Sequence, residues 1–161
     1  MTTIDTHHNP EAMQRYSTAK EYVETIKLVQ TSPHYIGQHV MMAIRPTHLL
    51  VGFALELYLK AWLLADGATP KKVRSLGHKL RDAFELAVAR GLAEDNGIYQ
   101  LVDHVAEPHG QDHDYVYRYS KVGSKIEPLN WDKAYPILHK LDEIVDAHVG
   151  ASEHFGLKPG H

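Results

Sequence analysis

Residues 48–81, HLLVGFALELYLKAWLLADGATPKKVRSLGHKLR, form the stretch that decides the fold. The first eighteen of them, 48–65, are mostly apolar, contain no proline and are dominated by residues that favour helix. Asp66-Gly67 follows and supplies a stop, since glycine readily adopts the left-handed conformation that ends helices. The stretch therefore predicts a helix that is apolar on nearly all sides, which in a globular chain is a central core helix.

Two charges, Glu56 and Lys60, lie near the middle of this predicted helix. The helix is long enough for a membrane span, but each charge would be costly in hydrocarbon, so we expect no membrane association. The acid precedes the base by four residues, the favourable order for an ion pair on a helix. Either both side chains lie on a narrow exposed stripe, or they line a polar pocket inside a bundle.

Composition places the chain among ordinary globular proteins and excludes several kinds of site. Its 161 residues suit a single domain, with 43% hydrophobic and 23% charged residues. There is no cysteine, which excludes disulfides and thiolate metal sites. The polar N-terminus, MTTIDTHHNP, lacks the apolar core of a signal peptide, so we expect a cytoplasmic location.

Charge is distributed unevenly along the chain. The net charge of −3 predicts no general attraction to nucleic acid. Even so, five basic residues fall within eleven positions that contain no acid: Lys71, Lys72, Arg74, Lys79 and Arg81. Such a cluster is either a solvated loop or a surface for an anionic ligand, and the sequence leaves both interpretations open.

The remaining chain reads as further helices separated by proline and glycine. We expect helices over residues 9–30, 33–45, 48–65, 77–91, 94–107 and up to 149, the last opening at Asn130 or at Tyr135-Pro136. A kink or short break is expected at Arg45-Pro46, and Pro108 is expected to end its helix. Residues 68–76 are expected to form a basic loop. Residues 109–129 show no helical period, although 115–119 alternate as a strand would.

These elements predict an all-α fold, an up-and-down bundle of five to six helices. No internal repeat or second-domain boundary is evident, so residues 1–161 are expected to form one domain. Its core would cover about residues 10–148, with loose tails at 1–8 and 151–161.

Three motifs, in this order, resemble the HEPN superfamily. They are AlaLeuGluLeuTyrLeuLysAla at 54–61, GlyHisLysLeu at 77–80 and Arg118-Tyr119. The resemblance covers about residues 10–148 and implies a HEPN-like helical bundle, commonly a homodimer. It also implies a setting in prokaryotic defence or toxin–antitoxin systems, with a nucleotidyltransferase-type protein as a possible partner.

The chain departs from the ribonucleases of that superfamily at their catalytic motif. Those members carry an arginine followed five positions later by histidine, whereas Arg118 is followed at that spacing by Gly123. The usual metal-independent RNA-cleaving motif is therefore absent, and the resemblance leaves open whether the chain is an enzyme.

The motif residues that we expect to form a site are Glu56, Lys60, His78, Arg118 and Tyr119. Arg118 and Lys60 would hold phosphate, Glu56 would orient Lys60, and Tyr119 would stack on a base or fix Arg118. His78 is the candidate for positioning or transferring a proton, and no other catalytic residue is assigned. The alternative is a structural polar network that holds the helices together without any ligand.

No metal or cofactor is expected. The best local group of possible ligands is His104, His109 and His113 with Asp112 and Asp114, but it lacks the spacing of a metal motif. We accordingly expect a domain that binds RNA or a nucleotide in a polar pocket between helices. Two alternatives remain: a noncanonical ribonuclease or nucleotide-processing enzyme, and an antitoxin-like subunit that only contacts another protein.

Overall fold

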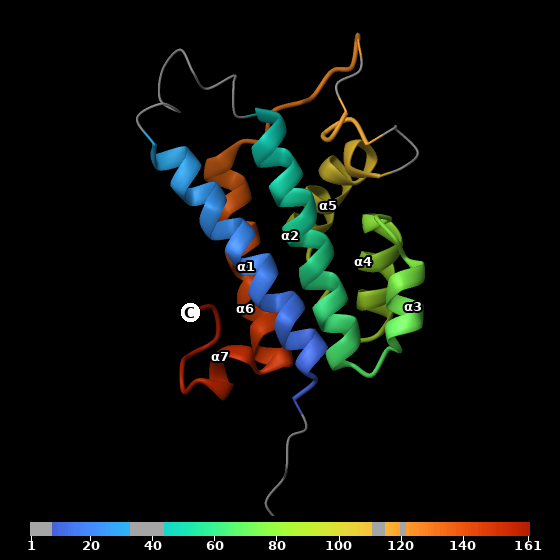
Figure 1. Cartoon of the computed structure of the whole chain (residues 1–161), viewed down its shortest axis with the longest axis vertical. Helices are drawn as coiled ribbons and strands as arrows, with labels where there is room; N and C mark the ends of the chain where they lie inside the picture. Colours follow the sequence, from blue (N-terminus) through green and yellow to red (C-terminus); the bar gives the residue numbers. More distant parts are fainter. Residues whose placement is uncertain (1–7, 33–43, 111–114, 120–121) are drawn as a thin grey trace, which may run out of the picture.

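The computed structural model describes residues 8–32, 44–110, 115–119 and 122–161 (Figure 1). Within these residues the fold is all-α, which confirms the predicted helical bundle. The helices are α1 (Pro10–Thr31), α2 (Ile44–Ala65), α3 (Pro70–Ser75), α4 (Leu80–Ala89), α5 (Asn96–His109), α6 (Trp131–Val149) and α7 (Ala151–His154). The helix expected over residues 33–45 lies outside the described residues except for its last two positions, which belong to α2.

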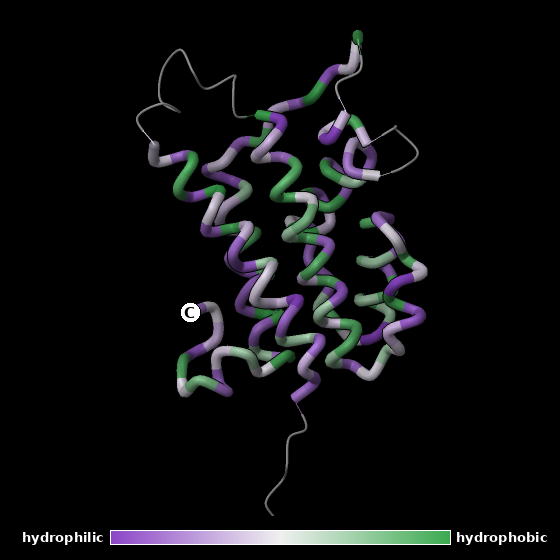
Figure 2. Tube along the Cα trace, in the orientation of Figure 1, coloured by the Kyte–Doolittle hydropathy of each residue, from purple (hydrophilic) through white to green (hydrophobic). Residues whose placement is uncertain are grey.

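Helix α2 is the centre of the bundle. Helices α1 and α6 pack along one side of it and α4 and α5 along the other (Figure 1). Figure 2 shows that α2 is predominantly hydrophobic along its length. By length and composition alone, α2 would pass as a membrane span, the one such helix in the described part of the chain. Its most apolar window is 72% buried within the bundle, as the core helix of a globular protein is.

The expected break at Arg45-Pro46 is wrong. Helix α2 already begins at Ile44 and carries Pro46 within its first turn. A proline is tolerated there because the first N–H groups of a helix have no intrahelical acceptor in any case. The rule that a residue before proline avoids the helical region is overridden here by the packing of the helix that follows.

The expected basic loop at residues 68–76 is also wrong, since α3 occupies most of it. Thr69 caps this short helix, its side chain accepting a hydrogen bond from the Lys72 N–H at 3.2 Å, and Pro70 is the first helical residue. Val73 is fully buried and anchors the turn to the core. The basic side chains of α3 therefore project from a rigid helical turn.

Two boundaries next to the candidate site differ from the prediction. Helix α4 begins at Leu80, so His78 lies in the turn before it, after Gly77 in a left-handed conformation (φ +55°). Helix α5 continues through Pro108 to His109 instead of ending at the proline. A proline in the last turn costs one hydrogen bond, and the extra residue places His109 on the buried face of α5.

Residues 115–119 form turns and not a strand. Of the two starts considered for the last helix, Asn130 is correct: it caps α6, and Pro136 lies inside the helix. Residues 151–161 are packed against the bundle rather than loose, with Ala151 and Ser152 buried and the Gly160 N–H bonded to Asp146.

Candidate functional site

A buried carboxylate, Glu56, is the centre of the candidate site. Its Oε1 accepts a hydrogen bond from Lys60 Nζ at 2.7 Å, and its Oε2 accepts from His78 Nδ1 at 2.8 Å and His109 Nε2 at 2.9 Å. Glu56 and Lys60 are each only 6% exposed, so the interpretation as an exposed stripe is wrong. The two side chains belong to a polar cluster between α2, the turn before α4, and the end of α5.

The cluster keeps Glu56 ionised. Burial by itself would raise the pKa of Glu56, but hydrogen bonds from His109, Lys60 and His78, together with the charge of Lys60, lower the pKa to about 2. Since the carboxylate is acceptor-only in this form, both histidines must donate a proton to it. Each histidine therefore carries a proton on the nitrogen that contacts Glu56, which is Nδ1 in His78 and Nε2 in His109.

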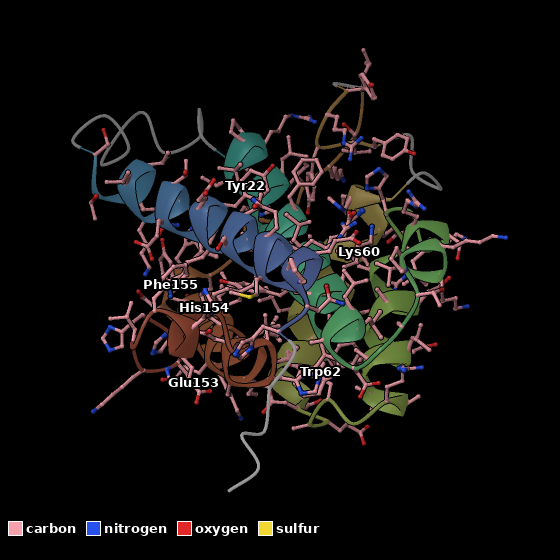
Figure 3. The ribbon with its side chains drawn as sticks, turned by 60° about the horizontal axis from the view of Figure 1, so that its bottom comes forward. Tyr22, Lys60, Trp62, Glu153, His154 and Phe155 are labelled. Carbon is pink, nitrogen blue, oxygen red and sulfur yellow. The ribbon has the colours of Figure 1, made fainter. Side chains whose placement is uncertain are left out.

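Lys60 connects α2 to the turn that carries His78. Besides Glu56, its Nζ donates to the Gly77 carbonyl oxygen at 2.7 Å. The left-handed conformation of Gly77 presents that carbonyl to Lys60 and the next side chain, His78, to Glu56. Figure 3 shows Lys60 on the opposite side of the molecule from the turn that carries Glu153, His154 and Phe155.

His109 belongs to the site, and the sequence analysis did not place it there. Its side chain is fully buried, and its Nδ1 has no hydrogen-bond partner. Gly52 on α2 makes room for it, because a Cβ at residue 52 would lie 2.3 Å from His109 Nδ1. One signal was present in the sequence: Val102, Val105, Ala106 and His109 share a helical face if α5 continues past Pro108.

Arg118 is held among aromatic rings and not by a carboxylate. Its guanidinium carbon lies 4.9 Å from the ring centre of Phe53 and 4.8 Å from that of Tyr115. Its Nη2 is nearly equidistant from the two ring nitrogens of His78, at 3.5 and 3.4 Å. Neither ring nitrogen is thus a close acceptor for Nη2, since a well-aligned N–H donor lies about 2.9–3.0 Å from its acceptor.

Among the residues that the structure describes, the donors of Arg118 thus find no strong acceptor. Its Nε is buried without a hydrogen-bond partner, and the part of the chain that the structure describes contributes no carboxylate to it. A guanidinium offers five donors in one plane, and buried donors are normally satisfied. An anion that approaches in the plane of the guanidinium would supply the acceptors that are missing.

Tyr119 is not part of the cluster. It is 65% exposed and touches the site only through Tyr115, whose ring centre lies 6.4 Å away. The structure thus brings together four of the five expected residues, Glu56, Lys60, His78 and Arg118, and adds His109, Gly52, Phe53 and Tyr115.

A pocket of about 420 Å³ opens beside His78 and Tyr115. The side chain of His78 is 34% exposed, which makes it the accessible part of the cluster. The pocket is lined by the α3–α4 turn on one side and the end of α5 on the other: Ser75, Leu76, Gly77, His78, Lys79, Leu80, Arg81, Asp82, Ala106, Glu107, Gly110 and Tyr115. Of its basic residues, Arg81 is already paired with Asp103 at 2.6 Å.

The cluster also meets the geometric requirement for a metal site. One ligand atom each of Glu56, His78 and His109 lies within 4.8 Å of the others. However, Lys60 lies 2.7 Å from the same carboxylate and Arg118 Nη2 lies 3.4 Å from His78 Nε2, so a divalent cation would enter beside two fixed positive charges. Both histidines also donate their protons directly to Glu56. The charges favour an anion over a cation.

Comparison of the chain with protein-family models, with curated proteins and with solved structures finds no match. Within the cluster, Glu56 and Lys60 neutralise each other, and the Arg118 guanidinium carries a further positive charge next to His78, which lines the pocket. Such an arrangement is suited to binding an anionic group and to holding one imidazole in a defined orientation.

Proposed function

We propose that this protein binds the phosphate group of a nucleotide or of RNA in the pocket beside His78. The observation that carries the proposal is the Arg118 guanidinium, which lies among aromatic rings with its Nε buried and unpartnered. A planar guanidinium is suited to a phosphate, which accepts two parallel hydrogen bonds. Phosphate is the class of anion that the resemblance to HEPN domains also implies.

The surroundings of the pocket support a nucleotide over a simple anion. Tyr115 lines the pocket and Tyr119 is exposed next to it, so both offer faces on which a base can stack. Lys71, Lys72 and Arg74 are exposed on and beside α3, whose last residue lines the pocket, and none forms an ion pair among the described residues. These charges would attract further phosphates of an RNA chain.

The test is binding of ATP and of a short single-stranded RNA to the wild type, to Arg118→Ala and to Arg90→Ala. Arg90 is a matched control because it forms a surface ion pair with Asp66, at 2.6 Å, and lies outside the pocket. We expect Arg118→Ala to weaken binding about 10- to 100-fold, since hydrogen bonds to charged groups contribute about 1.5–3 kcal/mol. Equal binding by all three proteins, with unchanged circular dichroism, would mean that Arg118 does not bind the ligand and that the cluster has only a structural role.

A second candidate function is acid–base catalysis at the same site, as a noncanonical ribonuclease or nucleotide-processing enzyme. The observation in its favour is the pair formed by Glu56 and His78, in which the carboxylate holds Nδ1–H at 2.8 Å and leaves Nε2 available. His78→Gln should then abolish turnover while ligand binding persists. Loss of both together, or no turnover by the wild type, would leave the binding function alone.

The resemblance alone carries two further parts of the proposal: a homodimer, and a setting in defence or toxin–antitoxin systems beside a nucleotidyltransferase-type partner. The cytoplasmic location that we propose follows from the polar N-terminus instead. Light scattering on the purified protein tests the dimer directly. The antitoxin-like alternative, in which the chain only contacts another protein, would be favoured if neither nucleotide nor RNA binds.

A further inference from the structure

A second polar cluster lies on the other side of α2, around the buried carboxylate of Asp146. Asp146 is 1% exposed and accepts hydrogen bonds from the Tyr16 hydroxyl, the Ser152 N–H, the Ser152 hydroxyl and the Gly160 N–H. Three of these donors belong to helices of the bundle: the Tyr16 hydroxyl on α1, and the N–H and hydroxyl of Ser152 on α7. The fourth, at 2.7 Å, is the main chain of a segment that follows α7.

Lys20, which is paired with the neighbouring carboxylate of Asp142, binds the other main-chain group of Gly160. Lys20 Nζ donates to Asp142 Oδ2 at 2.9 Å and to the Gly160 carbonyl oxygen at 2.8 Å. Asp142 is itself 5% exposed and accepts from the Tyr58 hydroxyl at 2.8 Å. The N–H and the C=O of Gly160 are thus both bound, by side chains that the bundle holds in place.

Only glycine fits at this position. Gly160 has φ +84°, which is strained for other residues, and a Cβ would lie 2.9 Å from Glu143 Cγ and 3.6 Å from Asp142 Oδ2. Its neighbour adds one further main-chain contact, in which the Ser152 hydroxyl lies 3.1 Å from the His161 carbonyl oxygen. The groups around Gly160 therefore bind main-chain atoms and leave no room for a side chain at this position.

The side chains in the rest of the segment contribute little to its attachment, although the main-chain N–H groups of residues 155–157 donate to carbonyl oxygens of α7. Phe155 is 71% exposed and Leu157 is 53% exposed, and Figure 3 shows Phe155 at the outer edge of the molecule. Two pockets lie beside Gly160 and His161. One of about 630 Å³ lies between α1 and α6 beside Gly160, and one of about 310 Å³ lies between α1 and α7 beside His161.

We propose that this groove between α1, α6 and α7 binds a glycine-containing peptide, and that residues 155–161 fill it in cis. The receptor side chains Asp142, Asp146 and Ser152 are buried, whereas residues 158–161 of the occupant are held in the groove through the main chain of Gly160 and His161. Because so little apolar surface is buried by the occupant, it can leave the groove at small cost. The two pockets then become one groove that accepts a second peptide of the same kind.

The test uses the full chain and the synthetic heptapeptide Phe-Gly-Leu-Lys-Pro-Gly-His, which reproduces residues 155–161. Gly160→Ala should unseat the segment, so that the residue-160 amide exchanges rapidly with solvent. The heptapeptide should then bind Gly160→Ala at least about 10-fold more tightly than it binds the wild type, because in the wild type the tethered segment competes at millimolar effective concentration. NMR shifts of the Ser152 and Lys20 amide signals report this binding. Gly156→Ala is the control, since that glycine has a similar φ of +72° but nothing within 4 Å.

Two results would overturn the proposal. One is continued protection of the residue-160 amide in Gly160→Ala, which would mean that the groove does not require glycine. The other is an unseated segment with no shift of Ser152 on addition of the peptide. If Gly160→Ala does not fold, the wild type serves instead: saturating heptapeptide should accelerate exchange of the Gly160 amide, and the peptide with alanine as its sixth residue should not.

Discussion

Gly52 and His109 are in direct contact across the α2–α5 interface, and each residue determines what the other can be. A Cβ at position 52 would lie 2.3 Å from His109 Nδ1 and 2.8 Å from His109 Cγ. The ring is fully buried and its Nε2 donates to Glu56, so it cannot retreat without losing that bond. A glycine in the middle of the most apolar helix is thus explained by the polar cluster beside it.

Gly52→Ala should therefore destabilise the fold although alanine favours helix. We expect a loss of about 1–3 kcal/mol in the free energy of unfolding, the usual cost of overpacking a core. Urea denaturation measures it. The double variant Gly52→Ala/His109→Ala removes the ring that clashes, and should lose less stability than the sum of the two single variants. Additive losses would mean that the two side chains do not interact as described.

Removing the charge of Glu56 should be more damaging than removing the whole ion pair. Glu56→Gln leaves Lys60 buried without its carboxylate, and we expect a loss of about 3–5 kcal/mol on that account. The double variant Glu56→Gln/Lys60→Met removes both charges and should recover part of the loss. As a surface control, Asp103→Asn breaks the half-exposed pair with Arg81 and should cost at most about 1 kcal/mol. An equal cost for Glu56→Gln and Asp103→Asn would contradict the burial of the cluster.

The depressed pKa of Glu56 predicts a specific acid sensitivity. Its pKa is about 2 in the fold against an ordinary value of 4.5. The folded protein therefore binds fewer protons than the unfolded chain between these values, and the stabilisation is present above pH 4.5 and lost as the pH falls towards 2. Carboxyl ¹³C NMR of Glu56 measures the pKa directly. A titration near 4.5 would show that the three hydrogen bonds do not offset the cost of burial.

His48 predicts a second loss of stability on acidification, at higher pH. Burial lowers its pKa from 6.5, against smaller opposing effects of its contacts with the Ile44 and Glu127 carbonyls. Its Nε2 accepts the Leu129 N–H at 3.1 Å, so the neutral ring is the form that fits. The contribution of His48 is present above pH 6.5 and decreases as the pH falls below that value.

The measurement for His48 is the free energy of unfolding of the wild type and of His48→Gln between pH 8 and 5. We expect the two proteins to converge as the pH falls. His148 must be treated in parallel, because its pKa is also lowered, mainly by burial against Trp62. If His48→Gln shows the same pH dependence as the wild type while His148→Gln does not, the effect belongs to His148.

Several features of the fold follow from the sequence because they depend on neighbours within a few residues. The apolar run at 48–65 predicts a core helix, and the four-residue spacing of Glu56 and Lys60 predicts their ion pair, which the structure shows with an N–O distance of 2.7 Å. Asn9, with proline after it, predicts the start of α1, and its side chain accepts the N–H groups of Glu11 and Ala12. Where the local rules were wrong, at Pro46 and Pro108, the prolines occupy terminal turns in which a helix tolerates them.

The tertiary structure alone decided what surrounds those elements. His109 donates to Glu56 from 53 positions away, and Arg118 contacts His78 from 40 positions away. Gly160 reaches Lys20 across 140 positions. None of these pairs has a period or a local motif, because the distance between them is determined by how helices pack. The sequence thus determined the longer helices and the charged pair within α2, and the packing of those helices determined which side chains complete the site.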